Sequence, residues 1–244
     1  MTPEAKKLSP VNRSRLHEEI VGQIQKRILS GAFKPGDKLP AEREVAAELE
    51  VNRATVREAL KKLEVLGLVE IRHGDGIYVK NFYESGNLEL FKNILYLEGT
   101  ISPDILSGVL QMRGIVVPEM AFDAARNRTK AELDELRKIV AAEEADLSLL
   151  EKDLALHHLV ARASKNLLYV FMLNFFNQIF RDYGFLYFER EENRQKSRQF
   201  HRDILAALEK GEEEKARRIM RAILEYTEKA IYAYYNTQQK PHQG

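Results

Sequence analysis

The sequence predicts a mainly α-helical protein, with an N-terminal winged helix-turn-helix that has a small β-hairpin wing and a C-terminal all-α helical bundle. Apolar residues recur at helical spacing over most of the chain. The period changes once, to β-rich runs on either side of the glycine-containing turn at 72–76. From residue 88 onward the patterns are helical again, without a repeat, so the two parts are expected to be separate domains.

The N-terminal part has the element order of a winged helix. Helices are predicted over 15–30, 41–50 and 54–66, because each range places apolar residues on one face and ends at a turn signal. The hairpin follows the third helix directly, as a wing does. The sequence therefore predicts a DNA-binding domain over 10–80 and a linker over 81–87.

The C-terminal part reads as an effector-binding and dimerisation domain over 88–236, followed by a disordered tail over 237–244. Pro118 lies within one of the predicted helices and is expected at a kink or break, since proline removes a backbone donor. A domain of this length is of ordinary size. Its helices are predicted over 88–98, 103–127, 130–148, 150–163, 167–189, 191–209 and 212–236.

Composition excludes several classes of protein. The 244 residues include no cysteine, which rules out disulfides, thiolate zinc sites, iron–sulfur clusters and cysteine nucleophiles. The longest apolar run, Leu167 to Leu173, is far shorter than the roughly 18 residues of a membrane span. The first ten residues lack the apolar core of a signal peptide. We therefore expect a cytoplasmic protein that does not enter a membrane.

A stripe of basic side chains marks the third predicted helix. Arg53, Arg57 and Lys61 follow one another at intervals of four, opposite the apolar positions. Residues 1–80 carry 15 basic and 12 acidic side chains, a net charge of +3, and the remainder carries −2. Taken singly, such charges are equally well explained as a solvated helix face. The stripe, the tight turn and the basic wing tip Arg72-His73-Gly74 together favour DNA binding, with the helix in the major groove and the wing at an adjacent minor groove.

These motifs resemble the winged-helix domain of GntR-type bacterial transcription regulators. The similarity covers Pro35 to Val79 and includes the runs LPAER at 39–43, RATVREAL at 53–60 and Gly67-Leu68. The resemblance implies contacts with operator DNA at six positions. They are Arg43, Arg53, Thr55, Arg57, His73 and Gly74.

The helical remainder resembles the ligand-sensing domain of the FadR branch of that family, on motifs around Arg113, Pro118-Glu119-Met120-Ala121 and Ala163-Ser164-Lys165-Asn166. Asp153 and His157 are four residues apart on a predicted helix and can chelate a divalent ion.

The resemblance adds His201 as a third ligand and implies a cofactor such as zinc or nickel. The fourth family ligand falls at Ile223, which cannot coordinate a metal. The alternative is that Asp153 and His157 form a surface pair and His201 is an ordinary polar residue.

A second candidate site centres on Arg113, which lies in an apolar helix and needs a counter-charge. A structural ion pair and an anionic ligand both satisfy that need. The resemblance implies a carboxylate or acyl-thioester effector. Asn174 and Gln178 in an aromatic helix, and Tyr226, are expected to line the same pocket or to lie in the core.

Together these observations predict a homodimeric, effector-responsive transcription regulator, most simply a repressor, that reads a near-palindromic operator. Its effector is a small organic acid or an acyl ligand. One alternative is a metal-free regulator of fatty-acid metabolism that responds to fatty acyl-CoA. Two rivals are a metal-dependent enzyme, which lacks any placed general base, and a nonspecific DNA binder, which the net charge of +1 disfavours.

Overall fold

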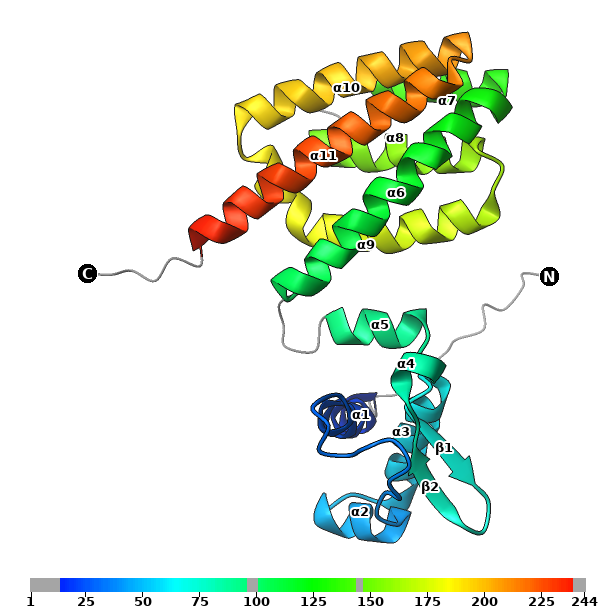
Figure 1. Ribbon diagram of the computed structural model, residues 1–244, viewed down its shortest axis with the longest axis vertical. Coiled ribbons are helices and arrows are strands. Elements are labelled where there is room, and N and C mark those ends of the chain that lie inside the picture. Colours follow the sequence, from blue (N-terminus) through cyan, green and yellow to red (C-terminus); the bar gives the residue numbers. More distant parts are fainter. Residues whose placement is uncertain (1–13, 96–100, 144–146, 239–244) are drawn as a thin grey trace, which may run out of the picture. The chain divides into compact units, whose positions relative to one another are not determined.

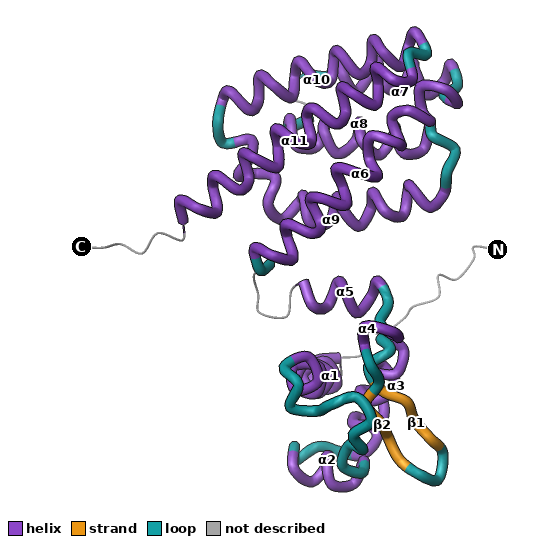
Figure 2. The backbone as a smooth tube through the Cα atoms, in the orientation of Figure 1, coloured by secondary structure: helices purple, strands orange, loops and turns teal. Residues whose placement is uncertain are grey.

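The computed structural model describes residues 14–95, 101–143 and 147–238, which fall into two compact units (Figure 1). The first unit ends at Ser102 and the second begins at Pro103. The two are described separately. Helices dominate both, and the strands form one two-stranded sheet in the first unit (Figure 2). The predicted fold class is confirmed.

The N-terminal unit is a winged helix. Its strands pair in antiparallel register, with Val69 opposite Val79 and Arg72 opposite Gly76. Lys38 adds an isolated bridge to Tyr78, which ties the segment before the second helix to the wing. The elements are α1 (Ser14–Leu29), α2 (Glu42–Glu48), α3 (Arg53–Val65), β1 (Val69–Arg72), β2 (Gly76–Val79), α4 (Phe82–Ser85) and α5 (Leu88–Leu95).

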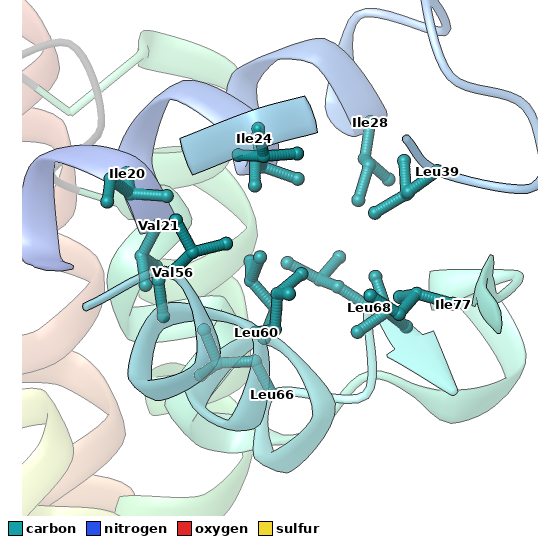
Figure 3. Close-up of a cluster of buried hydrophobic side chains, with 14 of the residues drawn as sticks. Ile20, Val21, Ile24, Ile28, Leu39, Val56, Leu60, Leu66, Leu68 and Ile77 are labelled. Carbon is teal, nitrogen blue, oxygen red and sulfur yellow. The ribbon is translucent and has the colours of Figure 1, made fainter. Parts of the chain in front are cut away.

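One apolar cluster holds this unit together (Figure 3). Side chains of α1 such as Ile24 pack on Val56 and Leu60 of α3, and the wing adds Ile77. Val56, Leu60 and Leu63 are each at most 1% exposed. The buried face of α3 therefore fixes the direction of its opposite, solvent-exposed face.

A tight turn joins α2 to α3. Glu50 takes a left-handed conformation with φ +53°, and the Asn52 side chain caps α3 by accepting from the backbone N–H of Thr55 at 2.8 Å. Such caps stabilise a helix by about 1 kcal/mol. The turn thus fixes where α3 begins, and with it the position of the basic stripe.

The segment predicted as a linker is folded onto the winged helix. The Ser85 hydroxyl of α4 donates to the carbonyl of Gly67 at 2.7 Å, and the Asn87 amide donates to the carbonyl of Val65. Gly67 has φ +76°, and a Cβ there would lie 2.1 Å from the carbonyl oxygen of Ser85. Leu90 of α5 joins the apolar cluster. The first unit thus continues past residue 88, where the sequence predicts the second domain to begin.

The C-terminal unit is an all-α bundle in which α6 packs mainly along α11, and α8 along α9. The predicted break at Pro118 does not occur, because α6 continues through it. Most of the tail predicted over 237–244 lies outside the described residues. The helices are α6 (Pro103–Asn127), α7 (Lys130–Ala141), α8 (Leu149–Ala163), α9 (Leu167–Phe188), α10 (Glu191–Lys210) and α11 (Glu213–Gln238).

Within the described residues, α6 is the one helix long and apolar enough to span a membrane. Val117, Met120 and Ala121 of this helix are at most 1% exposed, and α6 packs against α8 and α11. A core helix of a bundle has this composition, because apolar residues face it from several sides.

Truncation of Leu63, which is 0% exposed, should destabilise the N-terminal unit by roughly 3 kcal/mol, because Leu63→Ala leaves a cavity in the α1–α3 core. Val65→Ala is the matched control: Val65 lies in the same helix but is 71% exposed, so its loss should change stability little. Urea denaturation followed by circular dichroism measures both. Equal effects of the two substitutions would contradict the packing described.

Candidate functional site

The first candidate site is the exposed face of α3. Arg53, Arg57 and Lys61 all point to solvent, opposite the buried apolar face of the same helix. Nε and Nη2 of Arg57 both donate to the carboxylate of Glu42 in α2, with a shortest distance of 2.8 Å. This pair lowers the pKa of Glu42 and raises that of Arg57. Glu42 therefore orients the Arg57 guanidinium while leaving its side chain 60% exposed.

Thr55, at the start of α3, bonds to the cap residue Asn52 through its side chain as well as its backbone. The Thr55 hydroxyl donates to Oδ1 of Asn52 at 3.0 Å, in addition to the backbone bond. Its hydrogen is therefore used within the protein, and its oxygen lone pairs remain as acceptors. Asn52 and Glu42 were not singled out from the sequence, although an Asn directly before a helix is a recognised cap signal.

The wing is held by its own side chains. The Arg72 guanidinium lies 4.3 Å from the centroid of the Tyr78 ring and donates to Glu70 at 2.8 Å. Asp75 accepts from the Tyr78 hydroxyl at 3.0 Å and from Lys38 at 3.3 Å. These contacts lower the pKa of Asp75. A stiffened wing presents a defined tip.

At that tip, His73 and Gly74 are exposed, as a minor-groove contact requires. Gly74 has φ +78°, a conformation that glycine adopts at no steric cost. A Cβ there would meet nothing within 4 Å.

A cleft of about 740 Å³ lies between α3 and the wing. It brings together the predicted residues Arg57, Lys61, His73 and Gly74. Arg43, Arg53 and Thr55 are outside its lining, on α2 and at the start of α3. Arg72 of the predicted basic wing tip also lines it, as does Lys38, which no sequence motif had indicated. The face thus combines a helix of the width of a major groove with an adjacent basic loop.

The second candidate site is a buried polar centre in the helical unit. Asp153 and His157 of α8, His201 of α10 and Arg113 of α6 are each at most 5% exposed. Nε2 of His201 donates to Oδ1 of Asp153 at 3.0 Å. Nδ1 of His157 lies 2.8 Å from the backbone carbonyl of Asp153 and 3.4 Å from its Oδ2. The predicted trio therefore comes together, around Asp153.

Electrostatics couples these four groups. Burial raises the pKa of Asp153, but His157, His201 and Arg113 outweigh that effect, and the net shift is downward, so the carboxylate is charged. Burial lowers the pKa of His157, so its imidazole is neutral at neutral pH. The Nδ1 hydrogen then points to the Asp153 carbonyl and leaves Nε2 as an acceptor. That Nε2 has no partner among the described residues.

Arg113, like His157, has one nitrogen without a hydrogen-bond partner among the described residues. Its guanidinium lies 4.9 Å from the centroid of the Phe180 ring, and its Nε–H has no hydrogen-bond acceptor within the described part of the chain. Asp153 opposes the lowering of its pKa by burial. A buried guanidinium keeps its charge, so an unfilled donor here is costly unless an anion reaches it.

Three observations on the described residues weigh against a divalent metal at this centre. Across the described residues, no group of three or more His, Asp or Glu side chains is arranged to hold one. Both oxygens of Asp153 already face imidazole nitrogens, and Arg113 supplies a positive charge to the same carboxylate. Ile223, at the position of the fourth family ligand, is a buried apolar side chain.

The residues predicted to contact the effector do not share one pocket. Tyr226 donates to Asn193 at 2.9 Å and packs edge-on against Tyr187, 6.3 Å between centroids. Burial raises the pKa of Tyr187 to about 12, so that phenol stays neutral beside Asp153. Asn174 and Gln178 instead line a separate cleft, whose lining does not include Arg113.

Family profiles cover almost the whole described chain. The profile described as bacterial regulatory proteins of the gntR family matches residues 16–79. The FadR C-terminal domain profile matches residues 80–240. The chain belongs to the GntR family. It is a DNA-binding transcription regulator with a FadR-type effector-binding domain, and the metal-dependent enzyme is thereby excluded.

Relatives agree with membership of the GntR family, and a solved structure agrees with the fold. The chain is 34% identical over 181 residues to a fatty acid metabolism regulator protein of Shewanella oneidensis, covering 74% of this chain and 75% of that one. It is 39% identical over 129 residues to the HTH-type transcriptional regulator Mce2R of Mycobacterium tuberculosis, 53% of each. The chain also resembles the solved structure of Lar of Listeria monocytogenes, with 18% sequence identity and a TM-score of 0.53. The match covers 93% of this chain and 99% of Lar, and it supports the fold alone.

Arg57→Ala should weaken binding to a DNA fragment selected from random sequences about 10- to 100-fold, because a forked contact of this kind is worth about 1–3 kcal/mol. Fluorescence anisotropy at constant salt measures it. Arg126→Ala removes an equal charge from an exposed position in α6 and should leave affinity unchanged. Equal affinity of the wild type and the Arg57 variant would rule out the stripe as a reading face.

Proposed function

We propose that this GntR-family regulator acts as a homodimeric repressor in the cytoplasm and releases a near-palindromic operator when its helical domain binds an organic carboxylate or acyl effector. Two copies of α3 and the wing reading two half-sites give the operator its symmetry, since a two-fold protein fits two-fold DNA. The ordered α3 face and the stiff wing described above support the reading of a defined sequence.

The single observation that carries the effector assignment is the buried Nε–H of Arg113, which is unpartnered within the described residues. The neighbouring Nε2 of His157 is a free acceptor there. An anionic oxygen satisfies the first and a hydroxyl or N–H donor satisfies the second. Binding at this centre changes operator affinity only if the effector favours one of two states of the protein.

A fatty acyl effector is the more specific candidate. The Shewanella relatives are named fatty acid metabolism regulator proteins, which favours it. The aromatic surroundings of Arg113 and His157, with Phe180 and Phe200 in ring contact, favour an apolar chain as well.

The same centre supports a mechanism without zinc or nickel. Arg113 takes the place of a divalent ion as the positive charge that stabilises the Asp153 carboxylate. Asp153, His157 and His201 then act as a hydrogen-bonded support that orients the ligand-binding groups. Their role is structural and electrostatic, and no bond of the effector is broken.

Exposed apolar side chains on α6 and α9 support the homodimer. Met112 and Ile115, three residues apart on α6, are 48% and 61% exposed, and Leu168 and Phe171, three apart on α9, are 63% and 59% exposed. The two helices pack on each other. Exposed apolar residues repeating on neighbouring helices are typical of a subunit interface.

Addition of oleoyl-CoA, or of a small carboxylate effector, should weaken operator binding by the wild type, and Arg113→Gln should need about 10- to 100-fold more effector for the same release. The loss of a charged hydrogen bond has that magnitude. A gel-shift titration measures it, with Arg126→Gln as a control for removing a surface charge. The proposed release mechanism is wrong if an effector binds the wild-type protein and its operator affinity does not change.

The purified protein should contain no stoichiometric zinc or nickel, and chelator treatment should leave its melting temperature unchanged, because Arg113 already balances Asp153. Inductively coupled plasma mass spectrometry and a thermal melt measure this. One equivalent of metal that depends on both His157 and His201 would contradict the proposal.

A further inference from the structure

A second cleft, separate from the Arg113 centre, lies between α7, α8 and α9. Its volume is about 690 Å³, within the range of about 300–1,000 Å³ typical of small-molecule sites. None of its lining residues belongs to the buried centre. It therefore needs an explanation of its own.

Two helix stripes form the walls of this cleft. Asn174, Asn177, Gln178 and Arg181 follow one another on α9 at intervals of three, one and three residues, so they share one face. Facing them, α8 contributes a stripe of mixed character. Its members are Glu151, Leu154, Ala155, His158, Leu159 and Arg162.

Asn177 is the observation that points to a ligand. Its side chain is 8% exposed, and its Oδ1 has no hydrogen-bond donor among the described residues. A buried carbonyl oxygen without a donor costs about 1–3 kcal/mol. A molecule in the cleft that donates an O–H or N–H would remove that cost.

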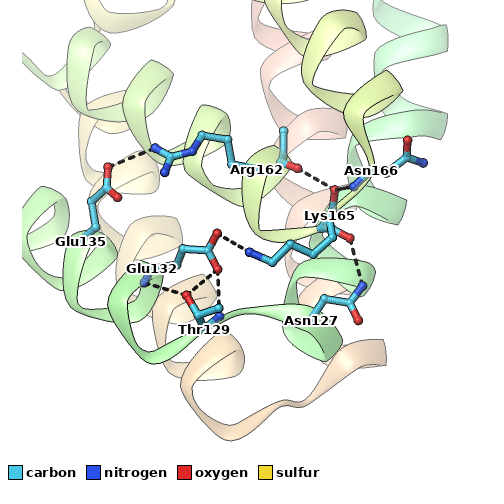
Figure 4. Close-up of polar contacts among 9 residues, drawn as sticks. Asn127, Thr129, Glu132, Glu135, Arg162, Lys165 and Asn166 are labelled. Carbon is cyan, nitrogen blue, oxygen red and sulfur yellow. Dashed lines mark hydrogen bonds and ion pairs between the residues drawn. The ribbon is translucent and has the colours of Figure 1, made fainter.

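Four charged side chains line the cleft: Glu135 and Glu151, whose carboxylates already have partners, and Arg162 and Arg181. Arg181 is exposed and forms no ion pair with any described residue. Hydrogen bonds from Ser148 and the charge of Arg181 both lower the pKa of Glu151. Arg162 reaches from α8 to Glu135 of α7 at 3.4 Å, a long contact between half-exposed side chains (Figure 4). The guanidinium groups of Arg162 and Arg181 can each donate two parallel hydrogen bonds to the carboxylate of a ligand in the cleft.

We infer that the α7–α8–α9 cleft is a second ligand site, for a small organic acid that also carries a hydroxyl or amino group. The acid binds Arg181, with Arg162 as a second cation. The hydroxyl or amino group donates to Oδ1 of Asn177. Leu154 and Leu159 provide an apolar floor for the carbon skeleton. This inference is independent of the effector proposed for Arg113.

Isothermal titration of the full-length protein without DNA tests the site, with glycerate, citrate and L-glutamate as probes. Butyrate, which has the acid but no donor group, is the chemical control. At least one of the three probes should saturate one site per chain, and butyrate should bind at least 10-fold more weakly. Asn177→Leu, which keeps the volume but removes Oδ1, and Arg181→Gln should each weaken that probe about 10-fold.

Arg113→Gln and Arg126→Gln should leave this binding unchanged, which separates the cleft from the centre and from loss of surface charge. Because Asn177 is buried, a thermal melt accompanies its variant; if that variant does not fold, the exposed Arg181 decides the result. The inference is overturned if none of the probes binds, if binding survives the loss of Arg181, or if Arg113→Gln abolishes it. None of these results bears on operator release by the effector at Arg113.

Discussion

The burial of one guanidinium governs the organisation of the helical unit. A charged group can remain in a protein interior only if opposite charge and hydrogen bonds replace the water it has lost. Arg113 receives part of that compensation from Asp153 through space and part from the Phe180 ring. Asp153 is in turn fixed by His201 and His157. Helices α6, α8, α9 and α10 thus meet at one incompletely balanced charge.

The DNA-reading unit depends on a different constraint, the amphipathic division of α3. Leu60 and Leu63 are buried against α1. The opposite face of α3, which carries Arg53, Arg57 and Lys61, must therefore point to solvent. Glu42 then restricts the rotamers of Arg57, which lowers the entropy that a DNA contact would cost. Precision at this face comes from packing on one side and from an ion pair on the other.

Local patterns predicted most of the fold, and long-range contacts account for the differences. Most of the long helices begin and end close to their predicted residues, since apolar period and capping signals are properties of neighbouring residues. The helix predicted over 130–148 is the exception, because α7 ends at Ala141 and the next residue leaves the helical conformation. The segment 81–87 has linker composition, yet Ser85 and Asn87 bond to carbonyls 18 and 22 residues earlier. Pro118 sits inside an unbroken helix because the packing of α6 on α11 and α8 outweighs one lost backbone bond.

The candidate sites show the same division. Spacing placed Asp153 and His157 on one face of α8, but only the fold brings in His201, 48 residues away, and Arg113 from α6. Spacing also placed Asn174 and Gln178 together, while their separation from Arg113 depends on which neighbour each face of α9 meets. A sequence pattern shows which residues share a helix face, but it does not show which other helix that face packs against.

Helix α8 contributes residues to both sites, the buried centre around Arg113 and the cleft with α7 and α9. Asp153 and His157 face the buried centre, whereas Ala155, His158 and Arg162 line the cleft with α7 and α9. A helix in a close-packed bundle moves as a unit, since side chains on both sides have little free volume. Ligands at the two sites would contact different faces of the same helix. Two ligands that prefer different positions of α8 must affect each other's binding, and by equal factors, because such coupling is reciprocal.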